Sequence, residues 1–224
     1  MSDTQQKVKV WDMCLRLFHW SLAVLFALSA YSAFQDKFGI YADMHFYAGY
    51  TILILIVWRF IWGFWGSETA RFRHFVGSPT AAIKHLRSMI TGAPYREVGH
   101  SPLAGYSVLL MLLLLLAQAM MGLFATDGMI FSGPLSRDVS GELSSDLTKW
   151  HKLLGLILIY LIGLHIFVIC LYGFVKKANL VWPMIVGSTR IGAGQSAPTL
   201  RSNWLGLLLF MVAGGVVCSL VFLL

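Results

Sequence analysis

The sequence predicts an all-α integral membrane protein, and three observations support this prediction. Hydrophobic residues make up 58% of the 224 positions and charged residues only 12%, with a mean hydropathy of +0.73. Soluble domains carry about 25% charged residues. Five apolar segments approach the ~20 residues that a helix needs to cross a bilayer. Tryptophan recurs near the ends of these segments, as it does in the aromatic belts of membrane interfaces.

The five transmembrane helices are expected at residues 15–34, 45–65, 103–124, 150–174 and 204–224. These helices are expected to pack as a single bundle. Residues 179–224 are expected to add a cytoplasmic connector and a fifth, C-terminal transmembrane helix. No further domain is needed to account for the length of the chain.

The first segment has a second interpretation. Lys7, Lys9 and Arg16 lie before or at the start of an apolar run, and the sequence Ser-Ala-Tyr-Ser-Ala follows at positions 29–33. This is the pattern of a cleavable signal peptide. The apolar run is long enough to span a bilayer, and it contains His19. We therefore favour a retained helix.

Lysine and arginine are distributed unevenly among the connecting segments. Thirteen of the 17 lie in the N-terminal segment, in residues 59–96 and in residues 176–201. The positive-inside rule then places the N-terminus in the cytoplasm and the C-terminus outside. This distribution accounts for the net charge of +7 without a nucleic-acid partner.

The second cytoplasmic segment contains an amphipathic pattern at residues 81–90. Apolar side chains recur at helical spacing, with Lys84, His85 and Arg87 between them. This pattern fits a short helix that lies on the anionic inner leaflet. An ordinary solvated loop fits the same residues equally well.

Four histidines lie within or near the ends of the predicted spans. His151 and His165 share one segment and are 14 residues apart, roughly 21 Å along a helix and within about 40° of the same face. His19 lies near the cytoplasmic end of the first helix, and His45 opens the second helix on the outer side. The topology therefore predicts an outer pair, His45 with His151, and an inner pair, His19 with His165.

This arrangement of histidines suits two six-coordinate b-type haems. Ionisable residues inside a bilayer are costly, so their presence suggests a function. Neutral imidazoles are good axial ligands of haem iron, and each pair comes from two different helices. The chain has no Cys-x-x-Cys-His motif, which argues against covalently attached haem. A haem-free small transporter or proton relay, in which the histidines titrate, is the alternative.

Two glycines strengthen the haem interpretation. Gly49 follows His45 by four residues, and Gly155 follows His151 by four, which places each glycine on the same helix face as its histidine. A missing side chain there leaves room for a flat macrocycle. Small-residue packing between transmembrane helices is the other explanation.

Cations near the histidines are candidate partners of the haem propionates. The candidates are Arg16 and Arg59 at the inner level, and Lys149 and Lys152 at the outer level. Arginine matches carboxylate geometry, although Arg16 and Arg59 also have the length to extend to the cytoplasmic interface. The remaining histidines, in the second cytoplasmic segment, are expected to be surface residues: His74, His85 and His100.

Several short motifs resemble the bacterial cytochrome b561 and nickel–iron hydrogenase cytochrome b-subunit family. They are Val10-Trp11-Asp12, Arg16-Leu17-Phe18-His19-Trp20, His45 through Gly49, Gly99-His100-Ser101-Pro102-Leu103, Trp150-His151-Lys152 and Gly163-Leu164-His165. The resemblance covers about residues 8 to 178. The fifth span departs from the minimal four-helix pattern of the family.

The resemblance implies that the first four helices form a four-helix transmembrane bundle within a domain of residues 1–178. This bundle would bind two b-type haems, with His19–His165 and His45–His151 as axial pairs. The resemblance also implies a bacterial inner-membrane cytochrome that exchanges electrons between the quinone pool and a periplasmic partner. That partner would be a hydrogenase or a c-type cytochrome. Some members of the family oxidise superoxide at the outer face and pass the electrons to quinone. This enzymatic version is the principal alternative.

Overall fold

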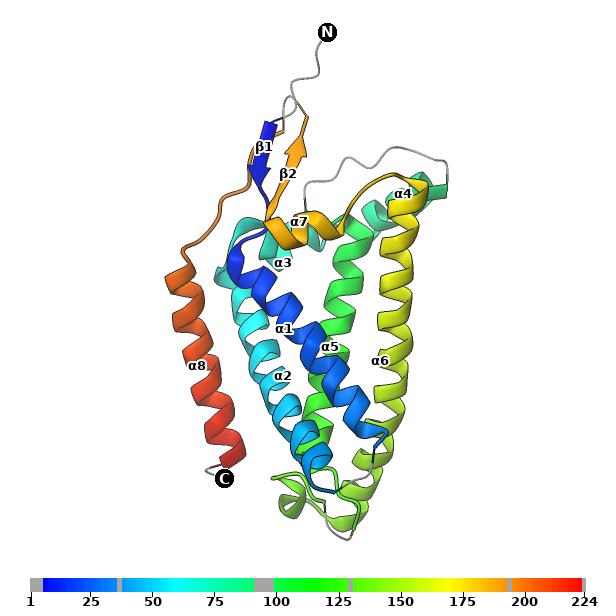
Figure 1. Ribbon diagram of the computed structural model, residues 1–224, viewed down its shortest axis with the longest axis vertical. Coiled ribbons are helices and arrows are strands. Elements are labelled where there is room, and N and C mark those ends of the chain that lie inside the picture. Colours follow the sequence, from blue (N-terminus) through cyan, green and yellow to red (C-terminus); the bar gives the residue numbers. More distant parts are fainter. Residues whose placement is uncertain (1–5, 36–37, 91–98, 129–130, 193–194, 223–224) are drawn as a thin grey trace. The chain divides into compact units, whose positions relative to one another are not determined.

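The computed structural model describes residues 6–35, 38–90, 99–128, 131–192 and 195–222. Five long helices dominate this part of the chain: α1 (Met13–Ala33), α2 (Ile40–Trp65), α5 (Pro102–Phe124), α6 (Gly141–Val175) and α8 (Asn203–Phe222) (Figure 1). Each is long and apolar enough to cross a membrane. The predicted all-α membrane fold with five spanning helices is confirmed.

Shorter elements lie between and before the long helices: β1 (Gln6–Lys9), η1 (Glu68–Ala70), α3 (Phe72–Phe75), α4 (Pro79–Ile90), η2 (Ser136–Asp138), α7 (Val181–Val186) and β2 (Ser188–Ile191). β1 and β2 pair antiparallel, with Val8 opposite Thr189, and lie side by side in Figure 1. The hydropathy pattern does not predict these strands, because two four-residue strands far apart in the chain leave no periodic signal.

Side-chain caps define where helices begin. The carboxylate of Asp12 accepts the backbone N–H of Leu15 at 2.7 Å and so caps the first turn of α1. The hydroxyl oxygen of Ser140 accepts the backbone N–H of Leu143 at 3.2 Å and does the same for α6.

Two helices begin five or more residues earlier than hydropathy predicts. α2 begins at Ile40 instead of residue 45, and α6 begins at Gly141 instead of residue 150. A hydropathy window detects only the apolar residues of a helix, which suit a lipid environment. The backbone hydrogen bonds of the helix continue through polar flanking residues to the nearest cap. The prediction that His45 and His151 open their helices is therefore wrong, because both residues lie inside α2 and α6.

The amphipathic pattern of the second connecting segment forms the helix α4. Proline occupies its first position, and the hydroxyl oxygen of Ser78 accepts the backbone N–H of Ala81 at 3.3 Å. Ala82 is buried, while Ile83 and Lys84 are exposed. The helix is confirmed, and its contact with a leaflet stays a prediction.

The chain divides into two compact units. Unit 1 comprises Met1–Phe18, Arg59–Leu110 and Leu164–Leu207. Unit 2 comprises His19–Trp58, Met111–Gly163 and Leu208–Leu224. All five long helices contribute residues to both units.

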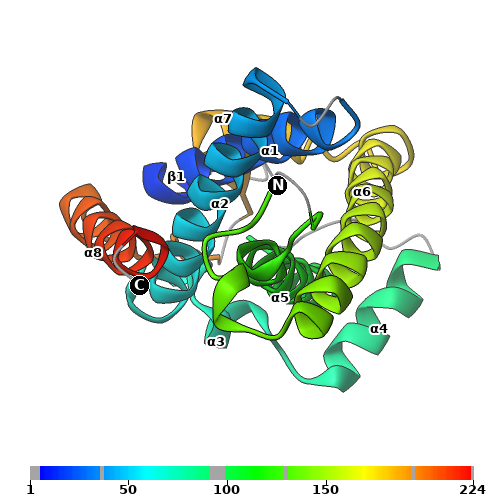
Figure 2. The same cartoon turned by 90° about the horizontal axis from the view of Figure 1, so that it is seen from below.

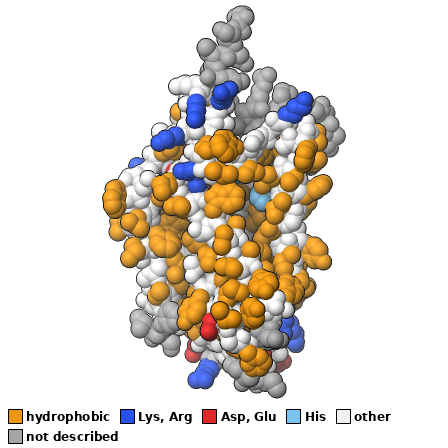
Figure 3. Space-filling model, viewed as in Figure 1, with side chains coloured by type: hydrophobic (Ala, Val, Ile, Leu, Met, Phe, Trp, Pro, Cys, Tyr) orange, Lys and Arg blue, Asp and Glu red, His pale blue; other side chains and the backbone are white. Residues whose placement is uncertain are grey.

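Unit 1 contains the two strands and a small core beneath them. Val8, Val10 and Ile191 are buried together, and Trp11 packs against them. The backbone N–H groups of Val10 and Trp11 both donate to the carbonyl oxygen of Gly187, at 2.9 and 3.1 Å. Lysine and arginine side chains gather near the strands in the surface view, and hydrophobic side chains cover the helices (Figure 3).

The segment before α8 is fastened to the end of α2 by Glu68 and Ser67. The carboxylate of Glu68 accepts the backbone N–H and the hydroxyl of Thr199, at 2.8 and 3.0 Å. These hydrogen bonds lower the pKa of the Glu68 carboxyl below its ordinary value, because they favour the charged form. The hydroxyl oxygen of Ser67 accepts the backbone N–H of Arg201 at 3.0 Å. These hydrogen bonds hold the segment that leads into the fifth helix, α8.

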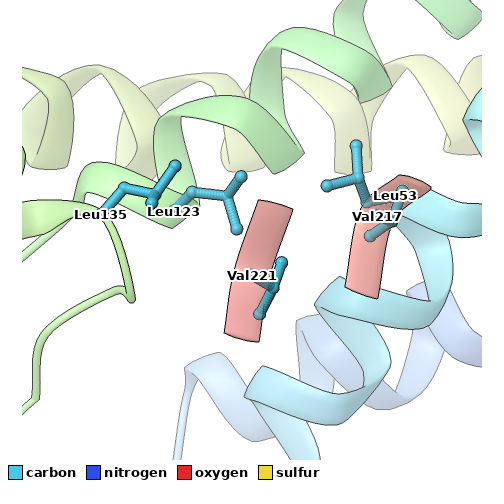
Figure 4. Close-up of a cluster of buried hydrophobic side chains, with 5 residues drawn as sticks. All are labelled: Leu53, Leu123, Leu135, Val217 and Val221. Atoms are coloured by element: carbon cyan, nitrogen blue, oxygen red, sulfur yellow. The ribbon is translucent and has the colours of Figure 1, made fainter. Parts of the chain in front are cut away.

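In unit 2, the C-terminal part of α8 packs against α2, as the end-on view shows (Figure 2). The buried cluster at this contact consists of Leu53, Leu123, Leu135, Val217 and Val221 (Figure 4). These side chains are 2–7% exposed, so α8 is an integral part of the packing of unit 2.

Candidate functional site

Unit 2 contains a cavity of about 430 Å³. Its walls come from α1, α2, α5 and α6, with a contribution from the segment that follows α5. The lining is mostly apolar, but two imidazoles, those of His45 on α2 and His151 on α6, face it. An apolar cavity with a few convergent polar groups is the usual form of a cofactor site.

The two imidazoles face one another at a separation that suits one metal ion between them. Their ring centroids are 6.1 Å apart, and their planes are nearly perpendicular, at 84°. A metal–imidazole bond is about 2 Å long and the ring centre lies about 1 Å further, so two trans imidazoles have centroids about 6 Å apart. The observed separation matches this expectation.

Hydrogen bonds orient both rings for ligation through Nε2. Nδ1 of His45 lies 3.0 Å from the carbonyl oxygen of Ser29, and Nδ1 of His151 lies 3.0 Å from the carbonyl oxygen of Gln118. A carbonyl oxygen can only accept, so in each neutral ring the proton resides on Nδ1 and the lone pair on Nε2. Metal-binding histidines are commonly held in this way by a second hydrogen bond.

The glycines of the predicted site have different surroundings. A Cβ added to Gly49 would meet no described atom within 4 Å, and Gly49 lines the cavity. The space beside Gly155 is partly taken, because an added Cβ would lie 3.2 Å from Nε2 of Gln118. Gly49 therefore fits the predicted clearance for a macrocycle better than Gly155 does.

The residues of α5 that contact His151 were missed by sequence reasoning. Gln118 receives the Nδ1 proton of His151, and its side-chain amide nitrogen lies 3.4 Å from Nε2 of the same ring. A Cβ on Gly122 would lie 3.1 Å from Cε1 of His151, so the glycine makes room for the ring. A glutamine inside the apolar span predicted at residues 103–124 was the available signal.

The two lysines predicted to bind propionates near His151 differ in their surroundings. Lys152 lines the cavity beside His151. The ammonium group of Lys149 instead forms an ion pair with Asp146 at 2.8 Å on an exposed part of α6. Lys152 is thus the better placed partner for an anionic group in the cavity.

In unit 1, Arg59 is buried with one nitrogen unsatisfied. Its side chain is 1% exposed, and the guanidinium lies over the rings of Phe72 and Phe75, 5.1 and 5.8 Å from their centroids. Nη1 of Arg59 has no hydrogen-bond partner among the described residues. Asp12, which is also buried, accepts the indole N–H of Trp62 at 3.2 Å. A buried guanidinium nitrogen of this kind is a fitting partner for a carboxylate.

Arg16 makes a local contact instead. One guanidinium nitrogen donates a hydrogen bond to the carbonyl oxygen of Ile185, in the last turn of α7. Arginine side chains often satisfy the last carbonyls of a helix in this way. A Cβ on Gly187 would lie 3.1 Å from Nε of Arg16, so this glycine makes room for the contact.

The members of the predicted inner pair are found in different units. His165, on α6, belongs to unit 1, as Arg59 does. His19, on α1, belongs to unit 2, where its ring contacts Trp20 edge-on with centroids 5.1 Å apart. Their pairing stays a prediction.

His100 differs from the surface residue that its position in the sequence suggests. Its ring packs between Trp11 and Phe75, with both centroid separations 4.8 Å. His74 is a surface residue, 3.9 Å from the carboxylate of Glu68. The side chain of His85 lies outside the described residues. Tertiary packing of the loop aromatics, which hydropathy does not detect, explains why His100 is partly buried.

The described residues contain no group of three or more histidine, cysteine or acidic side chains that could hold a metal ion by themselves. A metal between His45 and His151 would therefore need further donors, and a porphyrin supplies four nitrogens in a plane between two axial ligands. The donor set, the ring separation and the open space beside Gly49 all fit a haem.

Comparison with known families gives an independent result. The model of the prokaryotic cytochrome b561 family matches residues 10–187. The chain belongs to this family. Searches of curated proteins and of solved structures returned no match.

Members of the prokaryotic cytochrome b561 family are membrane proteins that bind haem b and transfer electrons. The present protein is therefore a multi-pass membrane protein with haem b and redox partners, which confirms the resemblance seen in its motifs. The family match ends before α8, so the fifth helix is an addition of this chain to the matched region.

Proposed function

We propose that this cytochrome b561 binds two b-type haems and transfers electrons across the bacterial inner membrane. It would connect the quinone pool with a periplasmic redox protein, either a hydrogenase or a c-type cytochrome. The facing pair of His45 and His151 is the observation that carries this proposal. Both rings carry their lone pair on Nε2, and the cavity around them is largely apolar.

The second haem would be held by His19 and His165. His165 is 14 residues beyond His151 on the same continuous helix, so its ligand atom lies roughly 21 Å further along the axis. Arg59 would bind a propionate of this haem, since its buried Nη1 lacks a partner among the described residues. Lys152 would serve the haem of His45 and His151 in the same way. Arg16 and Lys149 are weaker candidates, because each already has a partner.

The bound haems would supply one-electron redox chemistry. The protein holds the ligand rings in one tautomer, excludes water with an apolar lining, and compensates the propionate charge with buried or nearby cations. The predicted cytoplasmic N-terminus would then place the His45–His151 site near the periplasmic face, within reach of a soluble partner.

Superoxide oxidation is the second candidate function. Lys152 is an exposed cation that also lines the cavity, so it could attract a small anion towards this site. In that case superoxide would be oxidised to oxygen, and quinone would accept the electrons.

The test is a haem count followed by electron donation. Protein purified in detergent should give a reduced b-type spectrum and two haems per chain by pyridine haemochrome, and a short-chain quinol should reduce them. A count of one haem would remove the His19–His165 pair from the proposal. Absence of haem from folded protein would refute it and leave the histidines as titrating groups of a transporter or proton relay. Haem reduction by superoxide would favour the second candidate.

A further inference from the structure

The two histidines that face the cavity of unit 2, His45 and His151, have unequal hydrogen-bond environments. Nδ1 of His45 is surrounded by three oxygen atoms: the carbonyl oxygen of Ser29 at 3.0 Å, the hydroxyl of Ser32 at 3.3 Å and the hydroxyl of Ser29 at 3.4 Å. Nδ1 of His151 lies near one oxygen among the described residues, the carbonyl of Gln118 at 3.0 Å.

The directions of these hydrogen bonds follow from the acceptors. The carbonyl oxygen of Ser29 cannot donate, so Nδ1 of His45 carries the proton. The hydroxyl of Ser32 donates to the same carbonyl at 2.9 Å, which leaves its oxygen lone pairs available to the ring N–H. The N–H of His45 thus has the carbonyl oxygen of Ser29 and the hydroxyl oxygen of Ser32 as acceptors, with the hydroxyl of Ser29 also nearby. Ser32 is buried at 5% exposure, where water competes little.

The chain places both serines on one face of α1. They are three residues apart in the last turns of the helix, and both line the cavity. Neither serine is a candidate metal ligand. Their common feature is the contact with His45.

We propose that Ser29 and Ser32 are positioning residues that make His45 a more electron-donating ligand than His151 and so lower the reduction potential of the haem held between them. This inference rests on the proposed haem site. Oxygen acceptors on the distant N–H of an imidazole raise its basicity as a ligand. A more basic ligand favours the oxidised, more positive iron, and hydrogen bonding around the ligands is one of the means by which a protein sets a haem potential.

The experiment uses Ser29→Ala, Ser32→Ala and the double variant of the full-length protein. Spectroscopic redox titration should show that the reduction potential of one haem rises. At a fixed solution potential, its ratio of reduced to oxidised form should be about threefold higher for each hydroxyl removed. Threefold corresponds to about 30 mV for a one-electron couple. The other haem should keep its potential. The low-spin electron paramagnetic resonance signal of the shifted haem should also change.

Thr51→Ala is the matched control. The hydroxyl of Thr51 donates to the carbonyl oxygen of Tyr47 at 2.7 Å on α2, one turn back, as Ser32 donates to Ser29 on α1, but it is not among the residues that line the cavity. Its removal should leave both potentials unchanged. Ser32→Thr keeps the hydroxyl and should restore the wild-type potential.

The outcomes separate this proposal from the haem site itself. Wild-type protein without haem refutes the proposed function. Full haem content with unchanged potentials in the double variant overturns the role of the serines, as does an equal shift of both haems. If Ser32→Ala loses haem, retention of haem by Ser32→Thr supports the hydroxyl. Loss of haem in both Ser32→Ala and Ser32→Thr would show that haem binding depends on the volume of the side chain at position 32 and not on its hydroxyl. That result overturns the proposal.

Discussion

The two units of this protein contain different arrangements of side chains that would suit a charged, flat ligand. Unit 2 has a mostly apolar cavity whose two imidazoles are oriented by backbone carbonyls. Unit 1 has a buried guanidinium, Arg59, among aromatic rings. In unit 2 the evidence for a ligand is the separation and orientation of two imidazole rings. In unit 1 it is a buried guanidinium nitrogen without a hydrogen-bond partner among the described residues. We therefore expect changes in unit 2 to alter metal ligation, and changes in unit 1 to alter charge compensation.

The strongest test of the comparison removes the ligands of unit 2. His45→Ala and His151→Ala should each lose one haem per chain, because a bis-imidazole site fails when either ligand is absent. The double variant should lose the same haem and no more. Pyridine haemochrome analysis measures this directly. Loss of two haems in the double variant but one in each single variant would mean that the two histidines serve different haems.

A second test examines the charge in unit 1. In a His45→Ala background, which should retain only the other haem, Arg59→Met should weaken haem retention about tenfold, because a charged hydrogen bond is lost. Arg59→Lys should recover part of it, since lysine supplies the charge but not the planar geometry. Haem content after gel filtration is the measurement. Unchanged retention in Arg59→Met would show that Arg59 does not bind a propionate.

Gly49 distinguishes a cofactor cavity from loose helix packing. Gly49→Ala introduces a methyl group that meets no described atom within 4 Å, and alanine is the better helix former. Packing alone therefore predicts equal or greater stability. A macrocycle against Gly49 instead predicts reduced haem content, by about half or more. Gly215→Ala on α8, which also meets no described atom, is the control and should keep full haem content.

The cap of α1 affects stability rather than haem ligation. Asp12→Ala should lower the free energy of unfolding by about 1–2 kcal/mol, because the first turn of α1 loses its cap. The indole N–H of Trp62 also loses its acceptor, which adds to the effect. Asp12→Asn retains an oxygen for the cap and should be milder. Thermal unfolding in detergent compares the variants, and equal melting temperatures for Asp12→Ala and wild type would contradict this role.

The smallest expected effect comes from Glu68 and depends on pH. Its pKa is lowered in the folded protein, so the stabilisation is fully present above the unfolded pKa of about 4.3 and is lost as pH falls through the lower folded value. Glu68→Gln should therefore melt below wild type at pH 7 and level with it at strongly acidic pH. The difference should stay under about 1 kcal/mol because the carboxylate is partly exposed.

Much of the fold could be predicted because a membrane helix is recognisable from the residues within its own segment. Apolar length, aromatic ends and charge distribution are properties of contiguous residues, and all five spans were found from them. Helix starts were less accurate, since hydropathy does not detect a cap such as Ser140. The contact of α8 with Leu53 and Leu123 was not predicted, because a uniformly apolar helix has no sequence pattern that indicates which helices it packs against.

The sequence by itself determined the fold class, the family and the histidines worth testing, because spacing along a helix dictates depth and face. Tertiary structure alone decided that His45 and His151 face one another, that Ser29 and Gln118 set their tautomers, and that Arg59 is buried while Lys149 is paired with Asp146. The physical reason is that orientation and hydrogen bonding depend on atoms from different helices. Those atoms are separated by many residues in the chain and meet only when the helices pack.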